Sequence, residues 1–305
     1  MSSACLFSHL QMITFGNIDN SFSGLNGSAM VILPVPYDGT STWIKGADKG
    51  PDAILNASAN MELFDIETQS EVFRNGIYTA PPVIEKSSPE AMLEKVFAEV
   101  RYFLSLGKFV ITIGGEHSIS YAPVKAYHEK YPDLTVLQLD AHTDLRQEYD
   151  GSKFNHACVM TRIKEICPVV QVGIRSMDIE ELKYIEPGRI FYAEDILHYD
   201  NWIEDVIRQL SGNVYITIDL DVFDPSVMPS TGTPEPGGLF WYDVLTLLGK
   251  VNEEKNIIGF DIVELCPNEI NKAPDFLASK LLYKLASYRF KKISNEKDRF
   301  FKNAC

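Results

Sequence analysis

The stretch LTVLQLDAHTDLR, residues 134–146, joins an apolar run to three closely spaced polar side chains. LTVLQL (134–139) has the length and continuous hydrophobicity of a strand that is buried on both faces. Asp140, His142 and Asp144 follow at every second position. In an extended chain, residues two apart face the same way. We therefore expect these three side chains to share one side where the strand runs out into its loop.

The same kind of strand recurs along the chain, and this repetition predicts the fold. Strand-like runs occupy residues 29–38, 109–115, 134–140, 169–174, 189–195, 213–221 and 256–264. Helical patterns fill 89–108, 118–131, 200–211, 241–254 and 274–290. Alternation of this kind is typical of a parallel sheet covered on both faces by helices. We expect a three-layer α/β/α fold with a central, mainly parallel sheet, in a single domain over residues 1–305. Residues 1–11 are either a loose extension or the product of an upstream start.

Composition excludes several classes of function. The chain has 305 residues, of which 45% are hydrophobic, enough for one large core. Its net charge of -14 argues against binding to nucleic acid or to an anionic membrane, and favours cationic ligands. The apolar runs are too short to span a membrane, and the N-terminus does not resemble a secretory signal. The five cysteines are unpaired in spacing, so we expect reduced thiols in a cytoplasmic protein.

Polar residues also follow three other predicted strands. His117 comes after strand 109–113 in GGEHS, Asp219 and Asp221 lie within DLDVFDP, and Glu264 closes GFDIVE. In a parallel sheet, the carboxyl ends of the strands meet at one edge, and ligands bind beyond that edge. We therefore expect these side chains to form one site together with those after strand 134–140.

This predicted cluster has the composition of a metal centre. It contains four carboxylates and two imidazoles: His117, Asp140, His142, Asp144, Asp219 and Asp221. Carboxylates gathered in a partly buried site repel one another strongly, and two divalent cations would offset that repulsion. Oxygen-rich ligation with some imidazole favours Mn²⁺, while Zn²⁺, Co²⁺, Ni²⁺ and Fe²⁺ remain open. A single Asp at a strand end is more often a cap or turn residue, but four Asp and two His at equivalent strand ends argue for metal binding.

The motifs GGEHS, DAHTDLR and DLDVFDP, in this order, resemble the three metal motifs of the ureohydrolases, the family of arginase and agmatinase. The resemblance extends over nearly the whole chain, from PVPYDGTS and KGPDAI through STGTPEPGGL to GFDIVELCP. NHACVM, GIRS and TGTPEPGGL are more similar to agmatinase-type members than to arginase. The resemblance implies an arginase-like fold and a binuclear manganese hydrolase. It favours agmatine as the substrate, with putrescine and urea as products, and hence a role in polyamine biosynthesis.

The resemblance also implies a role for each residue of the site. One Mn²⁺ would be held by His117, Asp140, Asp144 and Asp219, and the other by Asp140, His142, Asp219 and Asp221, so that Asp140 and Asp219 bridge the two ions. His156, in FNHACVM, corresponds to a loop histidine that shuttles protons. Glu264 corresponds to the acid that holds the guanidinium, and Thr233, in TGTP, lies beside the substrate carbon.

These roles make chemical sense, because a guanidinium is resonance-stabilised and needs a strong nucleophile. Two divalent ions lower the pKa of a bridging water and so supply hydroxide near neutral pH. A carboxylate such as Glu264 can hold the planar cation by paired charge-assisted hydrogen bonds. A histidine such as His156 suits delivery of a proton to the leaving amine.

Two departures from the family pattern bear on the substrate. Lys45 and Lys49 stand where family members often carry arginines, and the loop 146–155 does not match the arginase loop that reads the substrate's amino-acid end. Arginine is therefore disfavoured, while aminopropylagmatine, guanidinobutyrate, guanidine and formiminoglutamate stay open beside agmatine. A non-catalytic member that binds polyamines is a third hypothesis, but the presence of every expected ligand argues against it. The resemblance further implies a homo-oligomer, either a trimer or a hexamer.

Overall fold

The computed structural model describes residues 13–302, with the backbone alone described for residues 292–302. The segment 1–11 lies outside these described residues. The described chain contains an eight-stranded sheet in the order β2-β1-β3-β8-β7-β4-β5-β6, and every pairing is parallel. Its strands are β1 (Met30–Val35), β2 (Ile77–Thr79), β3 (Phe109–Gly114), β4 (Thr135–Leu139), β5 (Val169–Ile174), β6 (Ile190–Tyr192), β7 (Asn213–Asp219) and β8 (Asn256–Val263). The predicted parallel sheet is confirmed.

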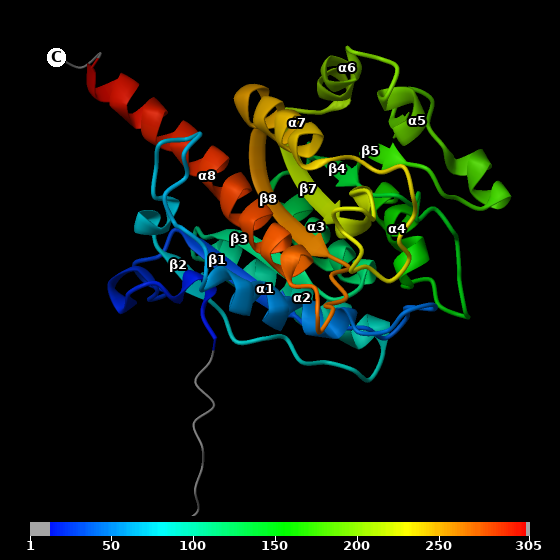
Figure 1. Cartoon of the computed structure of the whole chain (residues 1–305), viewed down its shortest axis with the longest axis horizontal. Coiled ribbons are helices and arrows are strands. Elements are labelled where there is room, and N and C mark those ends of the chain that lie inside the picture. The colour runs from blue at the N-terminus through cyan, green and yellow to red at the C-terminus, as the bar shows by residue number, and fades with distance from the viewer. Residues whose placement is uncertain (1–12, 303–305) are drawn as a thin grey trace, which may run out of the picture.

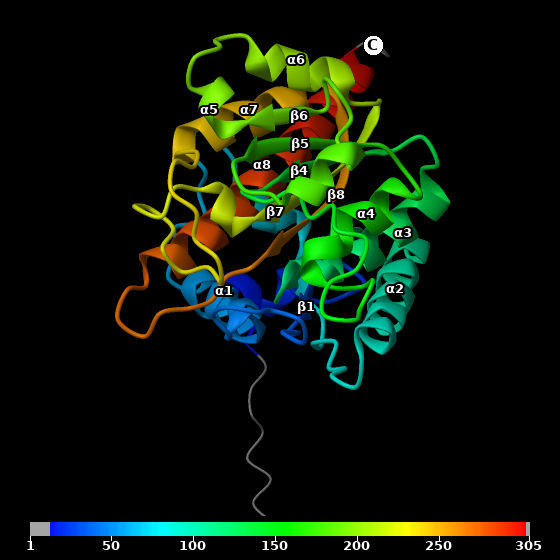
Figure 2. The same ribbon diagram turned by 90° about the vertical axis from the view of Figure 1, so that its right-hand side faces the viewer.

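Helices cover both faces of this sheet. They are α1 (Gly50–Ser58), α2 (Pro89–Ser105), α3 (Tyr121–Lys130), α4 (Val159–Lys164), α5 (Ala193–Ile196), α6 (Trp202–Gln209), α7 (Trp241–Glu254) and α8 (Ala273–Lys302). Helices α2, α3 and α4 lie on one side of the sheet, and α1, α7 and α8 lie on the other (Figures 1 and 2). The molecule is therefore the predicted three-layer α/β/α fold.

The continuous hydrophobicity of the strands follows from this double coverage. Along β1, Met30 and Ile32 belong to the core beneath α1, α7 and α8, whereas Val31 and Leu33 belong to the core beneath α2, α3 and α4. All four side chains are fully buried. Burial contributes roughly 1.5–3 kcal/mol for each large aliphatic side chain, so the two cores hold the sheet between its helical layers.

Local sequence signals set the bounds of the helices. At the start of α2, the Ser88 side chain accepts a hydrogen bond from the backbone N–H of Ala91 at 3.1 Å, and Pro89 occupies the first turn. Both features favour a helix start. Gly107, just past the end of the helix, adopts a φ of 73°. A left-handed residue at this position ends a helix, and glycine adopts it without strain.

Several elements differ from the prediction, among them α4, which was not predicted, and α8, which continues past the predicted 274–290. The run 189–195 is a strand only over β6, and the chain then turns into α5 at Ala193, where Glu194 and Asp195 lie in the favourable first turn of a helix. The short edge strand β2 was not predicted, because three residues give no usable periodicity. Helix α1 was also missed, since the Gly50–Pro51 pair reads as a turn in sequence, although proline is well tolerated in the first turn of a helix.

The strand order positions the site. Strands β3, β8, β7 and β4 are consecutive neighbours at the centre of the sheet. These are the four strands whose carboxyl ends carry the polar residues singled out in the sequence. Because all four run parallel, their ends lie side by side at one edge of the sheet.

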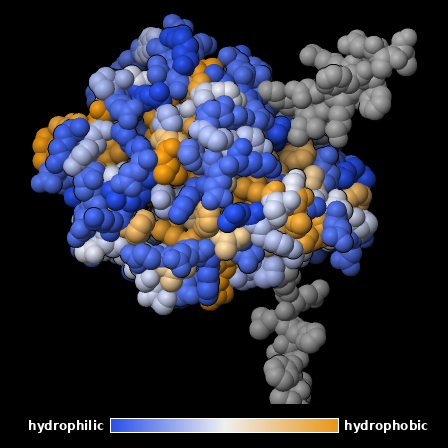
Figure 3. All heavy atoms as spheres, turned by 180° about the vertical axis from the view of Figure 1, so that it is seen from behind, coloured by the Kyte–Doolittle hydropathy of each residue, from blue (hydrophilic) through white to orange (hydrophobic). Residues whose placement is uncertain are grey.

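The face of the molecule seen in Figure 3 is mostly hydrophilic. On the face seen in Figure 3, hydrophobic residues form separate small patches among hydrophilic ones. None of the helices within residues 13–302 combines the length and the apolarity that a membrane span requires.

Candidate functional site

Both strand ends and turns bring the predicted ligands together: Asp219 is the last residue of β7, and His142 forms a parallel bridge with Ser176. Strand β4 ends at Leu139, and Asp144 has a φ of 51°. The expected extended conformation therefore ends before Asp144, whereas Asp140 and His142 do place their side chains together. After β7, Asp221 lies in a 3₁₀ turn, Leu220–Val222, in which its N–H donates to the Asp219 carboxylate at 2.9 Å. These tight turns fold the side chains back over the sheet edge.

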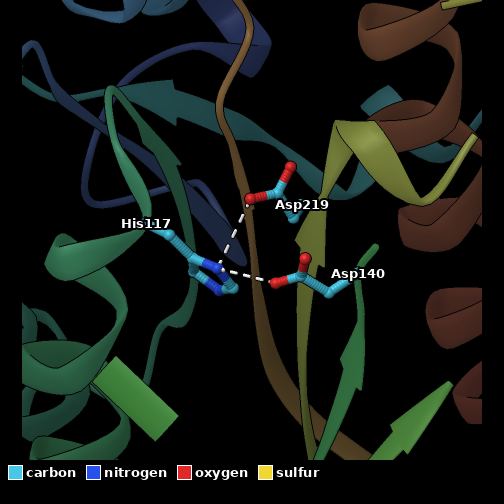
Figure 4. A group of neighbouring side chains, drawn as sticks. All are labelled: His117, Asp140 and Asp219. Atoms are coloured by element: carbon cyan, nitrogen blue, oxygen red, sulfur yellow. Dashed lines mark ion pairs between the residues drawn. The ribbon is translucent and has the colours of Figure 1, made fainter. Parts of the chain in front are cut away.

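The side chains converge in two overlapping groups. His117, Asp140 and Asp219 place one ligand atom each within 4.8 Å of one another, and Asp140, His142 and Asp221 do the same. Figure 4 shows the His117 ring facing the carboxylates of Asp140 and Asp219, with an ion pair to each. Asp144 completes the cluster, with Oδ2 3.0 Å from His117 Nδ1. The structure thus brings all six predicted ligands together, and Asp140 belongs to both groups.

The imidazole of His117 is oriented as a ligand. Its buried Nδ1 lies 3.0 Å from both Asp140 and Asp144 and 3.4 Å from Asp219, yet it makes no hydrogen bond with any described residue. On the other side of the ring, Nε2 lies 2.9 Å from Thr217 Oγ1. A partner on the second nitrogen is typical of metal-ligating histidines, because it fixes the orientation of the ring. The donor set of carboxylate oxygens and imidazole nitrogens fits a divalent cation.

The electrostatics of the cluster favour bound positive charge. Burial, followed by the charges of Asp221 and Asp140, raises the pKa of Asp219 well above its usual range. Burial and the charge of Asp140 raise the pKa of Asp144 to about 7. Burial alone would lower the pKa of His142, but the Asp221 and Asp140 carboxylates raise it to about 12. Carboxylates packed this closely shift the pKa values of their neighbours. Divalent cations bound among them would therefore stabilise the cluster.

A cavity of about 250 Å³ opens over the cluster. Glu264, Thr233 and His156 line it, as predicted residues of a substrate site would. Glu264 has a φ of 65°, and its Oε1 accepts a hydrogen bond from the backbone N–H of His117 at 2.7 Å. Burial raises the pKa of Glu264 well above its usual range. The hydrogen bond from His117 holds the Glu264 carboxyl group beside the cluster.

His156 lies in the 3₁₀ turn His156–Cys158 that precedes α4. The Asn155 side chain caps this turn by accepting a hydrogen bond from the N–H of Ala157. Burial, and then the positive charges of His117 and His142, lower the pKa of His156 to about 4. The imidazole is accordingly neutral at neutral pH.

The outer part of the cavity is lined by Trp43, Arg146 and Tyr149. Trp43 is 76% exposed. The guanidinium of Arg146 donates to Asp178 Oδ2 at 3.0 Å and lies 4.8 Å from the centre of the Tyr149 ring. Part of the loop 146–155, expected to face the far end of the substrate, thus contributes to the mouth of the cavity.

Arg175 and Glu235 also shape the site, and the sequence did not reveal their roles. Arg175 donates to the backbone carbonyls of Asp221 at 2.6 Å and Glu235 at 2.8 Å, which ties two loops to the end of β5. Glu235 Oε1 lies 3.8 Å from His142 Nε2. A lone arginine or glutamate in a loop offers no spacing pattern, although GIRS, which contains Arg175, was part of the resemblance.

Asp224 closes the loop after β7, as expected of a turn residue. Its carboxylate accepts hydrogen bonds from the N–H groups of Ser226, Gly237 and Gly238, at 3.0, 2.9 and 3.2 Å. These contacts hold the loop that leads from Asp221 to the TGTP turn and back to α7.

Comparisons with known proteins agree with this site. The family model described as Arginase family matches residues 28–287. The N(1)-aminopropylagmatine ureohydrolase of Synechocystis sp. is 38% identical over 272 residues, which cover 86% of this chain and 89% of that protein. The agmatinase of Pyrococcus horikoshii is 35% identical over 258 residues, covering 83% of this chain and 89% of that protein. The crystal structure of agmatine ureohydrolase from Thermoplasma volcanium superposes with a TM-score of 0.84 at 31% identity, covering 93% of this chain and 97% of that one.

Proposed function

The chain belongs to the arginase family, and we propose that it hydrolyses a guanidino compound with an amine tail, agmatine first among the candidates, to urea and putrescine. It is a hydrolase that acts on guanidino groups, as its relatives are. The proposal adds the chemistry of the tail, the identity of the metal and the roles of the individual residues.

The metal centre of the proposal is two Mn²⁺ ions. His117, Asp140, Asp144 and Asp219 would hold one ion, and Asp140, His142, Asp219 and Asp221 would hold the other. The buried His117 Nδ1, aimed at three carboxylates without a hydrogen bond, supports this assignment. Divalent ions bound there would acidify water and so supply the nucleophile at neutral pH.

The surrounding side chains would bind the guanidinium and move its proton. Glu264 would hold the planar cation through charge-assisted hydrogen bonds, since its carboxylate lines the cavity and is fixed by His117. Thr233 would border the guanidinium carbon. His156 would deliver a proton to the amine as it leaves, because its imidazole lines the cavity beside the proposed metal centre and can carry a proton from solvent to the leaving group.

One observation carries the choice of an amine tail. Among the described residues that line the cavity, Arg146 is the one Lys or Arg, and Asp178 already neutralises it. Lys45 pairs with Asp38 at 3.3 Å and lies outside the cavity lining. A substrate carboxylate would therefore meet acidic residues without a free cation, which can cost several kcal/mol in a desolvated site.

Aminopropylagmatine is the second candidate. The name of the Synechocystis relative favours it. The exposed Trp43 and the Tyr149 ring at the mouth of the cavity also favour it, because aromatic faces attract ammonium groups. An aminopropyl extension would add a further ammonium group that these aromatic side chains could bind.

The test is urea release from agmatine, aminopropylagmatine, guanidinobutyrate and arginine, with Mn²⁺ added to the assay. We expect kcat/KM for one of the two amine-tailed substrates to exceed that for arginine by at least ~10²-fold, the ratio for roughly 3 kcal/mol of differential binding. A higher kcat/KM for guanidinobutyrate or arginine would refute the proposed tail chemistry and leave the ureohydrolase chemistry intact.

A further inference from the structure

We propose that Thr40 is a positioning residue for His156, and that a relay from Glu116 through Thr40 fixes which ring nitrogen of His156 carries its permanent proton. The inference rests on the proposed function, because it explains how the proposed proton carrier is held. Thr40 and Glu116 lie on different segments, the loop after β1 and the turn after β3.

The first link is a close approach of two backbones. A Cβ on Gly115 would lie only 1.8 Å from the carbonyl oxygen of Tyr37, so glycine is required there. The backbone N–H of Gly115 donates to Val35 O, and that of Glu116 donates to Tyr37 O, each at 2.9 Å. This pairing places the side chain of Glu116 beneath the loop that contains Thr40.

The second link is the Glu116 carboxylate, which is fully buried. Its Oε2 accepts hydrogen bonds from the backbone N–H groups of Thr40 at 2.6 Å and Ser41 at 2.9 Å, and a longer one from the Ser41 hydroxyl at 3.4 Å. Its Oε1 accepts hydrogen bonds from the hydroxyls of Thr40 at 2.6 Å and Ser118 at 2.7 Å. The carboxylate is therefore an acceptor for the whole turn at Thr40.

The third link follows from counting hydrogens on Thr40. A hydroxyl has one hydrogen to donate and can accept through its lone pairs. That hydrogen is directed to Glu116, so Thr40 Oγ1 is left as an acceptor toward His156. It lies 3.1 Å from the backbone nitrogen of His156 and 3.2 Å from Nδ1 of the ring. Both atoms must then carry a hydrogen, which makes neutral His156 the Nδ1–H tautomer.

The consequence is that Nε2 becomes the exchangeable position. No described residue hydrogen-bonds to His156 Nε2, and the ring lines the cavity. Tyr149 packs edge-on against the ring, with centroids 6.2 Å apart, and limits its rotation. When the imidazole is doubly protonated, Nε2 gives its proton to the leaving amine, the Nδ1–H bond to Thr40 persists, and solvent reprotonates Nε2.

Kinetics test the relay through a double-mutant cycle in the Mn²⁺-loaded enzyme. Thr40→Val removes the hydroxyl at nearly constant volume, and Thr40→Ser is the matched control that keeps it. We expect Thr40→Val to lower kcat about tenfold with little change in KM, and Thr40→Ser to stay near the parent. In a His156→Ala background, Thr40→Val should lower kcat no further, because the side chain that it positions is gone. An equal loss in both backgrounds would overturn the proposal, since Thr40 would then only support the loop.

A second measurement reads the tautomer without turnover. Long-range ¹H–¹⁵N spectra of ¹⁵N-labelled, Zn²⁺-loaded protein, assigned with His156→Ala, distinguish a protonated Nδ1 from a protonated Nε2. We expect Nδ1–H in the parent and in Thr40→Ser. An Nε2–H tautomer in the parent would overturn the relay even if every guanidino assay succeeds. Conversely, Nδ1–H in a protein that hydrolyses no guanidino substrate would sustain the relay and contradict the proposed function.

Discussion

Replacement of Glu264 by glutamine should weaken binding of the substrate guanidinium and leave the metal centre intact. In the structure, Oε1 of Glu264 is committed to the backbone N–H of His117 at 2.7 Å. The glutamine carbonyl oxygen can keep that bond, which leaves the NH₂ group facing the substrate where Oε2 stood. A donor would then meet the N–H groups of the guanidinium. Hydrogen bonds to charged groups contribute about 1.5–3 kcal/mol, so a loss of 2–3 kcal/mol should lower kcat/KM about 30- to 150-fold.

The assay for this prediction is urea release at subsaturating substrate, measured for agmatine, aminopropylagmatine and arginine. The fold-loss should be alike for all three, because Glu264 is expected to read the shared guanidino group. Glu94→Gln, on the exposed side of α2, is the matched control and should retain parent activity. Metal content by mass spectrometry should be equal in all three proteins. Parent-like kcat/KM in Glu264→Gln, or a loss confined to one substrate, would refute the assigned role.

Three further predictions concern the metal centre, the proton carrier and the fold. Asp140→Asn should lower the bound Mn²⁺ below two ions per chain and abolish turnover, because Asp140 belongs to both groups of ligand atoms. Mass spectrometry measures the metal content, and urea release measures the turnover. One tightly held ion with full activity would contradict the two-metal centre. His156→Ala should keep the metals and slow turnover by ~10²–10⁴-fold, and loss of metal in this variant would mean that His156 has another role. Lys284→Ala should lower the free energy of unfolding by about 3–5 kcal/mol in chemical denaturation, since it leaves the buried Asp65 without its ion-pair partner, whereas Lys250→Ala, which breaks an exposed pair, should leave the free energy of unfolding nearly unchanged.

The parallel sheet could be predicted because its central strands are buried on both faces. Each residue of β1, β3, β4 and β5 is buried, and such runs remain visible in sequence as uninterrupted apolar segments. The edge strands β2 and β6 could be predicted less accurately from the sequence. They are three residues long, and β6 is only half-buried, so the hydrophobic pattern that would reveal them is weak.

The members of the site could be predicted from their position at strand ends, but their geometry could not. Asp144 and Glu264 reach the cavity through left-handed backbone conformations, with φ of 51° and 65°. Asp and Glu carry no sequence signal for such a turn comparable to that of glycine. Period-two spacing therefore indicated residues that the structure gathers in one cluster, although the backbone at Asp144 is not extended.

Contacts between distant segments were the hardest feature to foresee. The bond from Thr40 to Glu116 and the anchoring of two loops by Arg175 depend on side chains that are ordinary in isolation. They acquire roles only when the strand order brings their loops together. In the sequence, the segments PVPYDGTS and GIRS stood out only because they resemble family motifs. The hydrogen bonds of Thr40 and Arg175 give the physical reason why these segments are needed.

His117 connects the proposed metal centre to Glu264, the proposed guanidinium-binding residue. Its side chain supplies Nδ1 to the cluster of carboxylates, while its backbone N–H holds Oε1 of Glu264. The group expected to bind the guanidinium is therefore fixed to the same residue that is expected to bind metal. A displacement of about 1 Å between reacting groups can cost 10²-fold in rate, so a direct link of this kind keeps that separation constant. The positive φ of Glu264 is consistent with this requirement, because an extended backbone at that point would direct the carboxylate elsewhere.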